Sequence, residues 1–275
     1  MQPRDLLAEH QRMYELSDVV HRYAKREDLL AAEQTIFARL QPQLSSLRLL
    51  DLGVGAGRTT LHLASVTREY LGIDCSAAMV AACQRRFGDP APGGPGARFA
   101  IGDARRLDGV GDRSFDLVLF SYNGIDCVSH DDRMQILREA KRVLVPGGLL
   151  CFSSHNLRSL LWSPLLTMSL FRQRKGPLGL LADVWDCVSE TYSLLRANQD
   201  LLQKLRRPFA LIQNERGEEV YHVTVEEQLR QLRAAGFEEV EVFSTLSGTQ
   251  LHNAAAQQAL AEPWIYYLCR AAPDN

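Results

Sequence analysis

The feature that most constrains the fold of this chain is a glycine-rich segment at residues 49–60, which reads LLDLGVGAGRTT. Its apolar start predicts a buried strand, which breaks into a glycine turn and then a helix. Such a strand–loop–helix unit presents backbone N–H groups to a nucleotide-like ligand, and its glycines let the ligand lie where a Cβ would collide. A dinucleotide fingerprint would need glycine at position 58, which is Arg58, whereas the glycines here stand at 53, 55 and 57.

The segments that follow continue the alternation of strands and helices. Residues 70–74 predict a strand that ends in Asp74. This acid lies close to the offset of ~20 residues at which a carboxylate meets the ribose hydroxyls in nucleotide-binding units. Ser76 then predicts the N-cap of a helix that runs to about Phe87.

Three further landmarks complete the series. A short strand at 99–101 leads into a Gly-Asp pair, and the apolar run within residues 114–123 ends in polar groups. Residues 138–154 predict a helix, a Pro-Gly-Gly turn at 146–148 and another strand. Parallel strands joined by right-handed crossovers bring their carboxyl ends to one edge of a sheet, where ligands bind.

These five landmarks, in this order and spacing, resemble the motifs of class I S-adenosylmethionine (SAM) methyltransferases. The resemblance covers residues 45–155, and residues 222–271 fit the end of the same fold. It implies an α/β, Rossmann-like, seven-stranded and mostly parallel sheet with helices on both faces and an antiparallel last strand. It also implies SAM as the cofactor. The expected cofactor-binding residues are Asp51, Gly53, Gly55, Gly57, Asp74, Cys75, Met79, Gly102, Asp103, Ala104, Ser121, Tyr14 and Tyr23.

The acids of this set have distinct expected roles. Asp51 suits the cationic methionine end of SAM, and Asp74 suits the ribose hydroxyls. In the family, an acid at the place of Asp103 receives the adenine amino group. Tyr14 and Tyr23 belong to the N-terminal segment, where they either line the SAM pocket or simply pack on the sheet.

The chain divides into three predicted parts. Residues 1–44 form an N-terminal helical cap of two helices, and residues 45–155 with 222–275 form the SAM-binding core. Residues 156–221 interrupt the core as a helical insertion after the fifth strand, which we expect to act as a substrate lid. Its apolar stretch 160–171 is too short to span a membrane, and we favour a lid over contact with a membrane surface.

The remainder of the insertion and the end of the chain carry regular patterns. Residues 186–207 predict one amphipathic helix. Its apolar stripe comprises Val188, Tyr192, Leu195, Leu202 and Leu205. A hairpin is predicted at 214–221, and Thr224 predicts the N-cap of the next helix. Residues 240–243 and 265–269 supply the last two strands.

Methyl transfer is an in-line displacement on a sulfonium carbon, so the enzyme mainly has to hold the acceptor in line. A base is optional and depends on the pKa of the acceptor. The candidate catalytic residues are Tyr122, Asn123, His155 and Tyr221. His155 is either a general base near neutral pH or a structural imidazole, and the tyrosines either present hydroxyls and ring faces or pack. Residues 121–126 lack the Asn/Asp-Pro-Pro-Tyr/Phe motif of nucleic-acid and glutamine amino-methyltransferases, which argues against DNA substrates.

Composition and net charge limit the kinds of partner and the cellular location that we expect for this chain. The chain has 275 residues, 46% of them hydrophobic and 23% charged, and a net charge of −2, which argues against nucleic-acid binding. Its six cysteines form no Cys-x-x-Cys pair and fit a reducing cytoplasm. No signal pattern or transmembrane run occurs, so we expect a cytoplasmic protein, with a homodimer through residues 160–171 as one option. No metal site is predicted, because His130 with its two following aspartates fits the start of a helix.

The expected function is SAM-dependent methyl transfer to a small-molecule metabolite. Two alternatives remain open. In the first, SAM is the sole substrate and cyclises to azetidine-2-carboxylate with release of methylthioadenosine. In the second, the chain binds SAM without catalysis. The intact glycine loop, Asp74 and Asp103 argue against the second alternative, because degenerate family members usually lose one of these.

Overall fold

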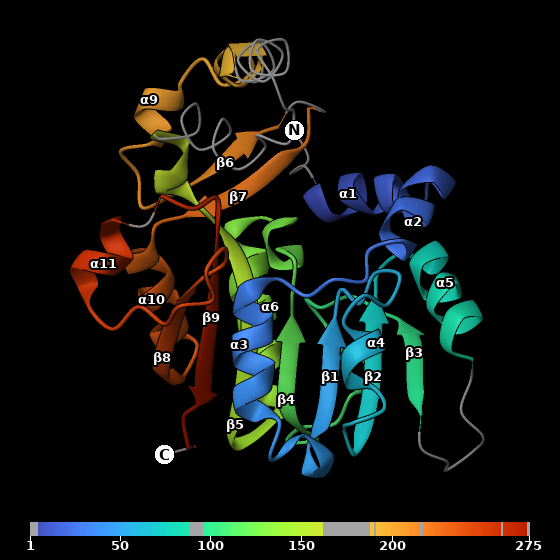
Figure 1. The fold of residues 1–275 in the computed structure, drawn as a ribbon. Helices are drawn as coiled ribbons and strands as arrows, with labels where there is room; N and C mark the ends of the chain where they lie inside the picture. The colour runs from blue at the N-terminus through green and yellow to red at the C-terminus, as the bar shows by residue number, and fades with distance from the viewer. Residues whose placement is uncertain are drawn as a thin grey trace, which may run out of the picture.

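The computed structural model describes residues 5–88, 96–161, 188–189, 191–214, 217–259 and 261–273. A central sheet is covered by helices on both faces (Figure 1). Seven of the described strands run across the sheet in the order β3, β2, β1, β4, β5, β9 and β8. Their bounds are β1 Arg48–Leu52, β2 Glu69–Asp74, β3 Ala97–Ile101, β4 Phe115–Phe120, β5 Leu144–Asn156, β8 Phe237–Ser244 and β9 Trp264–Ala271. The first five are parallel and β9 is antiparallel to both of its neighbours, which confirms the predicted Rossmann-like fold.

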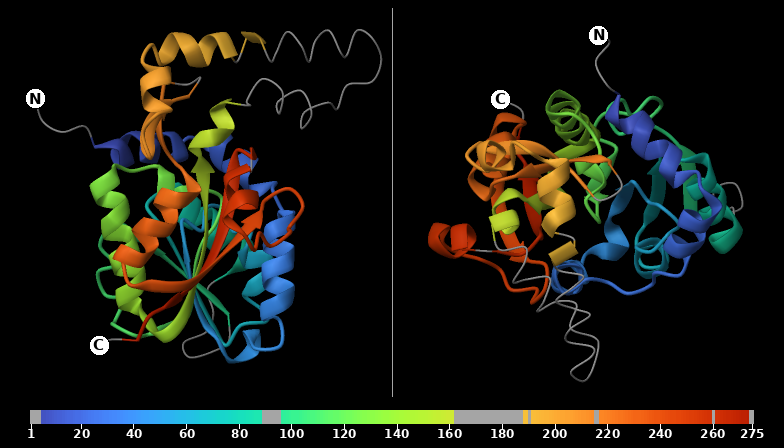
Figure 2. Two further views of the ribbon diagram at one scale, coloured as in Figure 1. Left: turned by 90° about the vertical axis from the view of Figure 1, so that its left-hand side faces the viewer. Right: turned by 90° about the horizontal axis from the view of Figure 1, so that it is seen from above.

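The helices form layers on the two faces of the sheet. Their bounds are α1 Leu6–Tyr14, α2 Ser17–Ala24, α3 Ala31–Leu40, α4 Thr60–Leu63, α5 Ala77–Phe87, α6 His130–Val143, α9 Leu201–Lys204, α10 Val225–Ala234 and α11 Ala254–Ala259, with 3₁₀ turns η1 Leu44–Ser46, η2 Gly124–Asp126 and η3 Leu157–Leu161. The helices α6 and α10 lie on one face and α3 on the other (Figure 2). Side chains alternate across a strand, so Leu50 and Leu52 of β1 pack toward α6, while Leu49 packs toward α3. No described helix is long and apolar enough to cross a bilayer.

The sheet is larger than the seven strands expected, because a hairpin extends it. Strands β6 (Phe209–Gln213) and β7 (Glu219–Val223) are antiparallel to each other, as predicted for this hairpin. Strand β5 runs past the end of β4, and its last residues, His155 and Asn156, pair in parallel with β7. The hairpin therefore stands above the carboxyl edge of the core sheet (Figures 1 and 2).

The Pro-Gly-Gly segment differs from its prediction. It does not separate a helix from a strand, because β5 follows α6 directly at Leu144. The pairing of β4 with β5 jumps from Phe115–Leu144 to Leu117–Leu149, so the segment is a bulge inside the strand. Gly147 lies at the centre of the bulge with φ of +77°, a left-handed conformation that favours glycine.

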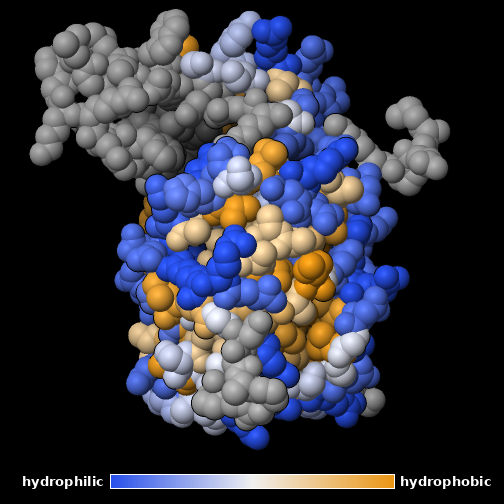
Figure 3. Space-filling model, turned by 90° about the vertical axis from the view of Figure 1, so that its right-hand side faces the viewer, coloured by the Kyte–Doolittle hydropathy of each residue, from blue (hydrophilic) through white to orange (hydrophobic). Residues whose placement is uncertain are grey.

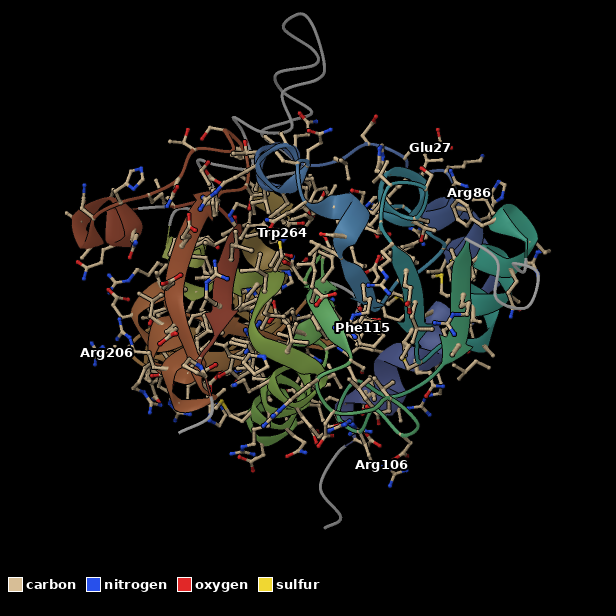
Figure 4. All side chains as sticks on the ribbon, turned by 90° about the horizontal axis from the view of Figure 1, so that it is seen from below. Glu27, Arg86, Arg106, Phe115, Arg206 and Trp264 are labelled. Carbon is tan, nitrogen blue, oxygen red and sulfur yellow. The ribbon has the colours of Figure 1, made fainter. Side chains whose placement is uncertain are left out.

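The N-terminal region contains three helices rather than the two predicted. The third, α3, packs against the sheet through Ala32, Ile36, Phe37 and Leu40, which are all buried. The other two lie above the carboxyl ends of the strands, and α2 packs on α5 (Figure 1). We call α1 and α2 the cap, since α3 contributes to the hydrophobic core. Glu27, between α2 and α3, forms an ion pair of 2.6 Å with Arg86 of α5 (Figure 4).

The helix predicted over 186–207 is broken in its described part. Residues 191–197 are helical, α9 follows, and Asn198 between them exchanges hydrogen bonds with the backbone of Gln213 in β6. The predicted apolar stripe was wrong at Val188, Tyr192, Leu195 and Leu202, which are 51–75% exposed, whereas Leu205 packs inward as predicted. The hydrophobic cluster of this region comprises Leu157, Leu194, Leu201, Leu205, Ala210 and Ile212.

Other local predictions are confirmed. The side chains of Ser76 and Thr224 accept hydrogen bonds at the N-termini of α5 and α10, as predicted. Helix α6 begins at His130, as predicted, and its N-cap is Ser129. The apolar stretch 160–171, with the proposed dimer contact, lies outside the described residues from position 162 onward. The opposite edge of the sheet is formed by β3, and Ile101 of this strand is 63% exposed. The face of the molecule on this side carries apolar residues among hydrophilic ones (Figure 3).

Candidate functional site

A pocket of about 790 Å³, open solvent at its mouth included, lies at the carboxyl ends of β1, β2 and β4. The cap supplies the opposite wall. The predicted site residues that line it are Tyr14, Tyr23, Gly53, Gly55, Asp74, Cys75, Met79, Gly102, Asp103, Ala104, Ser121 and Tyr122. The structure thus brings together most of the predicted cofactor set, while Asp51 and Gly57 lie outside the lining of this pocket.

The three glycines of the loop serve different purposes, although all have positive φ values of 57° to 84°. A Cβ on Gly53 would come within 2.8 Å of the Phe120 ring, and one on Gly57 would collide with the Phe87 ring. A Cβ on Gly55 would meet no atom closer than 3.7 Å, on Tyr23. Gly55 therefore leaves open space toward the pocket, whereas Gly53 and Gly57 permit close packing of the loop.

Asp74 holds the glycine loop in place. One carboxylate oxygen accepts the N–H of Gly55 at 2.8 Å, and the other accepts the N–H of Ser76 at 2.9 Å. Burial raises the pKa of Asp74, and the two N–H groups oppose that shift. Each carboxylate oxygen keeps a second lone pair, so Asp74 can accept two further hydrogen bonds from a ligand in the pocket.

The other two acids of the predicted set differ in their surroundings. Asp103 is partly exposed, and Arg105 orients its carboxylate through an ion pair of 2.8 Å. Asp51 is buried and accepts hydrogen bonds from Thr59 and Tyr70. Burial raises the pKa of Asp51 to about 6. Direct contact between Asp51 and a ligand would have to come through a smaller neighbouring pocket, which it lines together with Arg26 and Arg58.

Arg58 of this smaller pocket is neutralised by Glu33 of α3. Both guanidinium N–H groups bond the Glu33 carboxylate at 2.6 Å, and Glu33 is fully buried. Ser121 and Tyr266 also donate hydrogen bonds to Glu33. Burial alone would raise the pKa of Glu33, but the hydrogen bonds and charge of Arg58 lower it. This network fixes α3 and the end of β4 to the glycine loop.

Arg26 has no such partner. Its guanidinium lies 5.2 Å from the ring centre of Tyr23 and 5.0 Å from that of Tyr122, and it donates a hydrogen bond to the Tyr122 hydroxyl. No carboxylate of the described residues lies within ion-pair distance of it. A cation in a pocket beside backbone N–H groups is suited to bind an anion.

The cap is attached to both sides of the main pocket. Gln11 donates to the carbonyl of Cys75 at 2.8 Å, and the Glu15 carboxylate accepts from the first N–H groups of α5. On the other side, His10 bonds the carbonyl of Glu219 in β7 at 2.9 Å. Helix α1 therefore bridges the core and the inserted hairpin.

Tyr122 and Asn123 follow β4 with unusual backbone geometry. Both are left-handed, with φ of 60° and 62°. The Asn123 N–H donates to the Ser153 hydroxyl at 2.9 Å, while the buried Asn123 Oδ1 accepts from no described group. Tyr122 lines both pockets, and its ring packs edge-on against Trp264 at 4.9 Å. Non-glycine residues with positive φ are uncommon and often occur at functional sites.

His155 lies beside the pocket rather than in its lining. Its Nδ1 bonds Asp126 Oδ2 at 2.7 Å, and its backbone N–H donates to the same oxygen. Nε2 has no partner among the described residues. Its imidazole is therefore bonded to a carboxylate.

Tyr221 is separated from both pockets. It is fully buried, and its hydroxyl bonds His130 Nδ1 at 2.8 Å and Gln231 Nε2 at 3.0 Å. Its ring stacks on Phe209, and burial raises the pKa of Tyr221. The structure thus gives Tyr221 a packing position within the insertion and no access to the cofactor pocket. No cluster of three or more potential metal ligands occurs in the described part of the chain.

Comparison with known proteins identifies the part of the chain that carries this pocket. Residues 49–148 match the family described as methyltransferase domain. These residues are a class I methyltransferase domain. The matched region includes the glycine loop, Asp74, Asp103 and Tyr122.

Relatives of the methyltransferase domain act on different compounds. Ajmaline N-methyltransferase of Rauvolfia serpentina is 30% identical over 164 residues, which are 57% of this chain and 52% of the relative. Demethylmenaquinone methyltransferase of Beutenbergia cavernae is 33% identical over 153 residues, which are 54% and 58% of the two chains. The chain thus spans about half the length of the curated relatives it matches. The CcbJ methyltransferase of Streptomyces caelestis has the same fold, with a TM-score of 0.57, 16% identity and coverage of 94% and 98%.

Sequence reasoning missed several residues around the methyltransferase domain. Arg26 and Glu33 stand in the N-terminal segment, where charged residues are frequent and no motif distinguishes them. Trp264 meets His155 through the pairing of β5 with β9, and Asp126 meets it through the packing of η2 against the end of β5. Of these four residues, only Asp126 had a signal in the sequence that could have marked it as a site residue, namely its position directly after the polar end of the fourth strand.

Proposed function

We propose that this chain is a SAM-dependent methyltransferase that transfers the methyl group to a small-molecule acceptor. The observation that carries the proposal is the convergence of the open glycine loop at Gly55, Asp74 and Asp103 on one pocket beneath the cap. These groups match the three parts of SAM in chemistry. Asp74 is placed to accept the ribose hydroxyls, Asp103 the adenine amino group, and the loop leaves space for the methionyl chain.

The methionyl end then extends toward the smaller pocket. Both pockets share Gly53, Gly55 and Tyr122, so one elongated ligand can occupy them together. Arg26 is the group in that pocket that lacks an acidic partner among the described residues, and we assign it to the SAM carboxylate. The face of Tyr122 would lie near the sulfonium, where a ring attracts a cation.

A small acceptor is favoured by three observations. The named substrates of the two relatives, ajmaline and demethylmenaquinone, are small molecules. Cap and hairpin stand on two sides of the site, which suits a compact acceptor (Figure 2). The segment after β4 also lacks the motif of nucleic-acid amino-methyltransferases. The predicted homodimer and the lid role of the insertion remain proposals for the full chain.

The role of Arg26 predicts a ligand-specific effect. Arg26→Gln is expected to weaken SAM binding about ten- to a hundredfold, because a charge-assisted hydrogen bond contributes roughly 1.5–3 kcal/mol. Methylthioadenosine has the same nucleoside but no carboxylate, so its affinity should stay unchanged. Calorimetric titration with both ligands measures the difference. Arg22→Gln on the exposed side of α2 is the control, and an equal loss for both ligands would contradict the assignment.

The proposed activity is tested in two steps by mass spectrometry. Pure protein is first incubated with SAM alone and then with panels of small phenols, amines and thiols. S-adenosylhomocysteine together with a methylated acceptor supports the proposal. Methylthioadenosine with a four-carbon amino acid in the first step would establish SAM as the sole substrate. Tight SAM binding without any turnover, with tRNA and protein acceptors also tried, would favour a non-catalytic SAM-binding protein.

A further inference from the structure

We propose that Asp126 and His155 form a base dyad, and that the acceptor is a planar molecule with a weakly acidic hydroxyl group bound against Tyr122 and Trp264. This inference rests on the proposed methyltransferase function. It adds the identity of the base, the position of the acceptor and its chemical class.

The dyad is defined by its hydrogen bonds. Asp126 Oδ2 accepts both the His155 backbone N–H and its ring Nδ1, each at 2.7 Å. A neutral imidazole that donates from Nδ1 carries its lone pair on Nε2. Nε2 lies on the edge of the ring away from Asp126 and is bonded to no described residue. The side chain is 23% exposed, and Nε2 is the ring nitrogen that we assign to the substrate.

Asp126 is held far more firmly than a surface partner of histidine would be. It is fully buried, and its Oδ1 accepts from Arg133 and from the Ser154 hydroxyl. Burial would raise the pKa of Asp126, but the charge of Arg133 and the contacts with His155 lower it overall. The carboxylate thus stays ionised and can stabilise the imidazolium that forms when His155 accepts a proton.

Strand pairing connects the dyad to the cofactor pocket. His155 of β5 pairs directly with Trp264 of β9, and their rings lie 6.1 Å apart. Trp264 in turn packs against Tyr122, which lines the pocket. Tyr122, Trp264 and His155 therefore form a continuous row of rings. For a flat acceptor on this row, the hydroxyl to be methylated has to lie between the cofactor and Nε2, so that the same oxygen meets both the methyl group and the base.

The charges at the two ends of the row indicate a neutral acceptor. At the Tyr122 end, Glu33 is already paired with Arg58, whose guanidinium lies 5.1 Å from the Tyr122 ring centre, so this carboxylate is not free to hold a cationic amine. On the far side of His155, His222 of β7 has its ring centre 4.9 Å away. Burial lowers the pKa of His222 to about 3, so it is neutral at physiological pH. Asp126 on η2, Arg133 on α6 and His222 are the titratable groups that surround the dyad, and Trp264 adds none.

A neutral hydroxyl acceptor needs a base. A phenol has an ordinary pKa of about 10, so little of it is ionised at neutral pH. As the acceptor oxygen attacks, the O–CH₃ bond forms and the C–S bond breaks, leaving its electron pair on sulfur. The hydroxyl proton moves to His155 Nε2. The products are the methyl ether, neutral S-adenosylhomocysteine and an imidazolium that later loses its proton to solvent.

The first test is a pH profile of His155→Gln with a phenol that the wild-type protein methylates. The kcat/KM is expected to fall about 10²- to 10⁴-fold at pH 7, the usual contribution of a general base. It should then rise about tenfold per pH unit toward the pKa of the phenol, because hydroxide replaces the base. His222→Gln is the matched control and should keep the wild-type profile. An equal loss at every pH, or no loss, would overturn the dyad.

The second test requires no acceptor. Nitrogen NMR of histidine-labelled protein assigns His155 by the loss of its signals in His155→Gln. Neutral His155 is expected to carry its proton on Nδ1, and an Nε2–H tautomer would overturn the proposal even if SAM binding and turnover are normal. Turnover of amines or thiols without any phenol would show that the acceptor class is wrong. A protein that fails to methylate anything but shows the Nδ1–H tautomer would retain the dyad and refute the methyltransferase function.

Discussion

Replacing Asp74 with asparagine is expected to weaken the binding of SAM and S-adenosylhomocysteine at least about a hundredfold. The carboxylate already accepts N–H groups from Gly55 and Ser76, and the ribose hydroxyls would use its remaining lone pairs. An amide must turn its NH₂ group toward one of these donors. The loss of two charge-assisted hydrogen bonds of roughly 1.5–3 kcal/mol each accounts for the predicted factor.

Calorimetric titration with S-adenosylhomocysteine measures this effect. Asp108→Asn is the control, because that carboxylate is exposed and pairs only with the neighbouring Arg106 among the described residues. Asp74→Asn should also lower the thermal midpoint, since the loop contacts weaken before any ligand binds. A folded variant with wild-type affinity would exclude Asp74 from the cofactor site.

Replacing Arg133 with methionine is expected to lower the free energy of unfolding by about 3–5 kcal/mol, because it leaves a buried carboxylate without its partner. Arg133 is fully buried and donates hydrogen bonds to Asp126, Ser154 and Gln228. Its guanidinium also lies 4.8 Å from the ring centre of Tyr221. These contacts join η2, β5, β7 and α10 around a single charge.

Urea denaturation at two pH values tests the cause. Arg133 helps to lower the pKa of Asp126 in the folded protein. The ion pair therefore stabilises the fold fully above the pKa of an unfolded aspartate, about 3.9, and this stabilisation is lost as the pH falls through the lower pKa of the folded state. The loss in Arg133→Met should therefore be larger at pH 7 than near pH 4, where Asp126 of the variant can protonate. Arg138→Met, on the exposed side of the same helix, is the control. A loss below about 1 kcal/mol at both pH values would refute this account, since removing one partner of a buried pair usually costs more.

The cofactor half of the site could be predicted because its residues follow from local patterns. Each strand end carries its own polar group or glycine, and the parallel arrangement brings those ends together. Gly55, Asp74 and Asp103 needed no knowledge of distant contacts beyond the order of the strands. Tyr14 and Tyr23 were suggested by the family resemblance, as residues that either line the pocket or pack on the sheet, and the structure puts both in the pocket lining.

The rest of the site and the helical part of the insertion could not be predicted, because they depend on contacts between segments that are distant in the sequence. Residues 186–207 were expected to form one helix, but the pairing of Asn198 with β6 breaks it and shifts the buried face. Tyr221 seemed suited to catalysis, yet the hairpin turns it toward His130 and Gln231. The partner of His155 could not be identified either, because the contact with Asp126 depends on how η2 packs against the end of β5.

The bridge that α1 makes between the core and the hairpin has a kinetic consequence. Spent cofactor cannot leave past this wall until Gln11, Glu15 or His10 releases its contact. For the proposed methyltransferase, we expect a product that leaves by this route to depart no faster than the cap opens. Stronger hydrogen bonds of α1 would keep water out of the site better, but they would also slow the release of the spent cofactor. The strength of these few hydrogen bonds is therefore a compromise between closing the site and releasing the product.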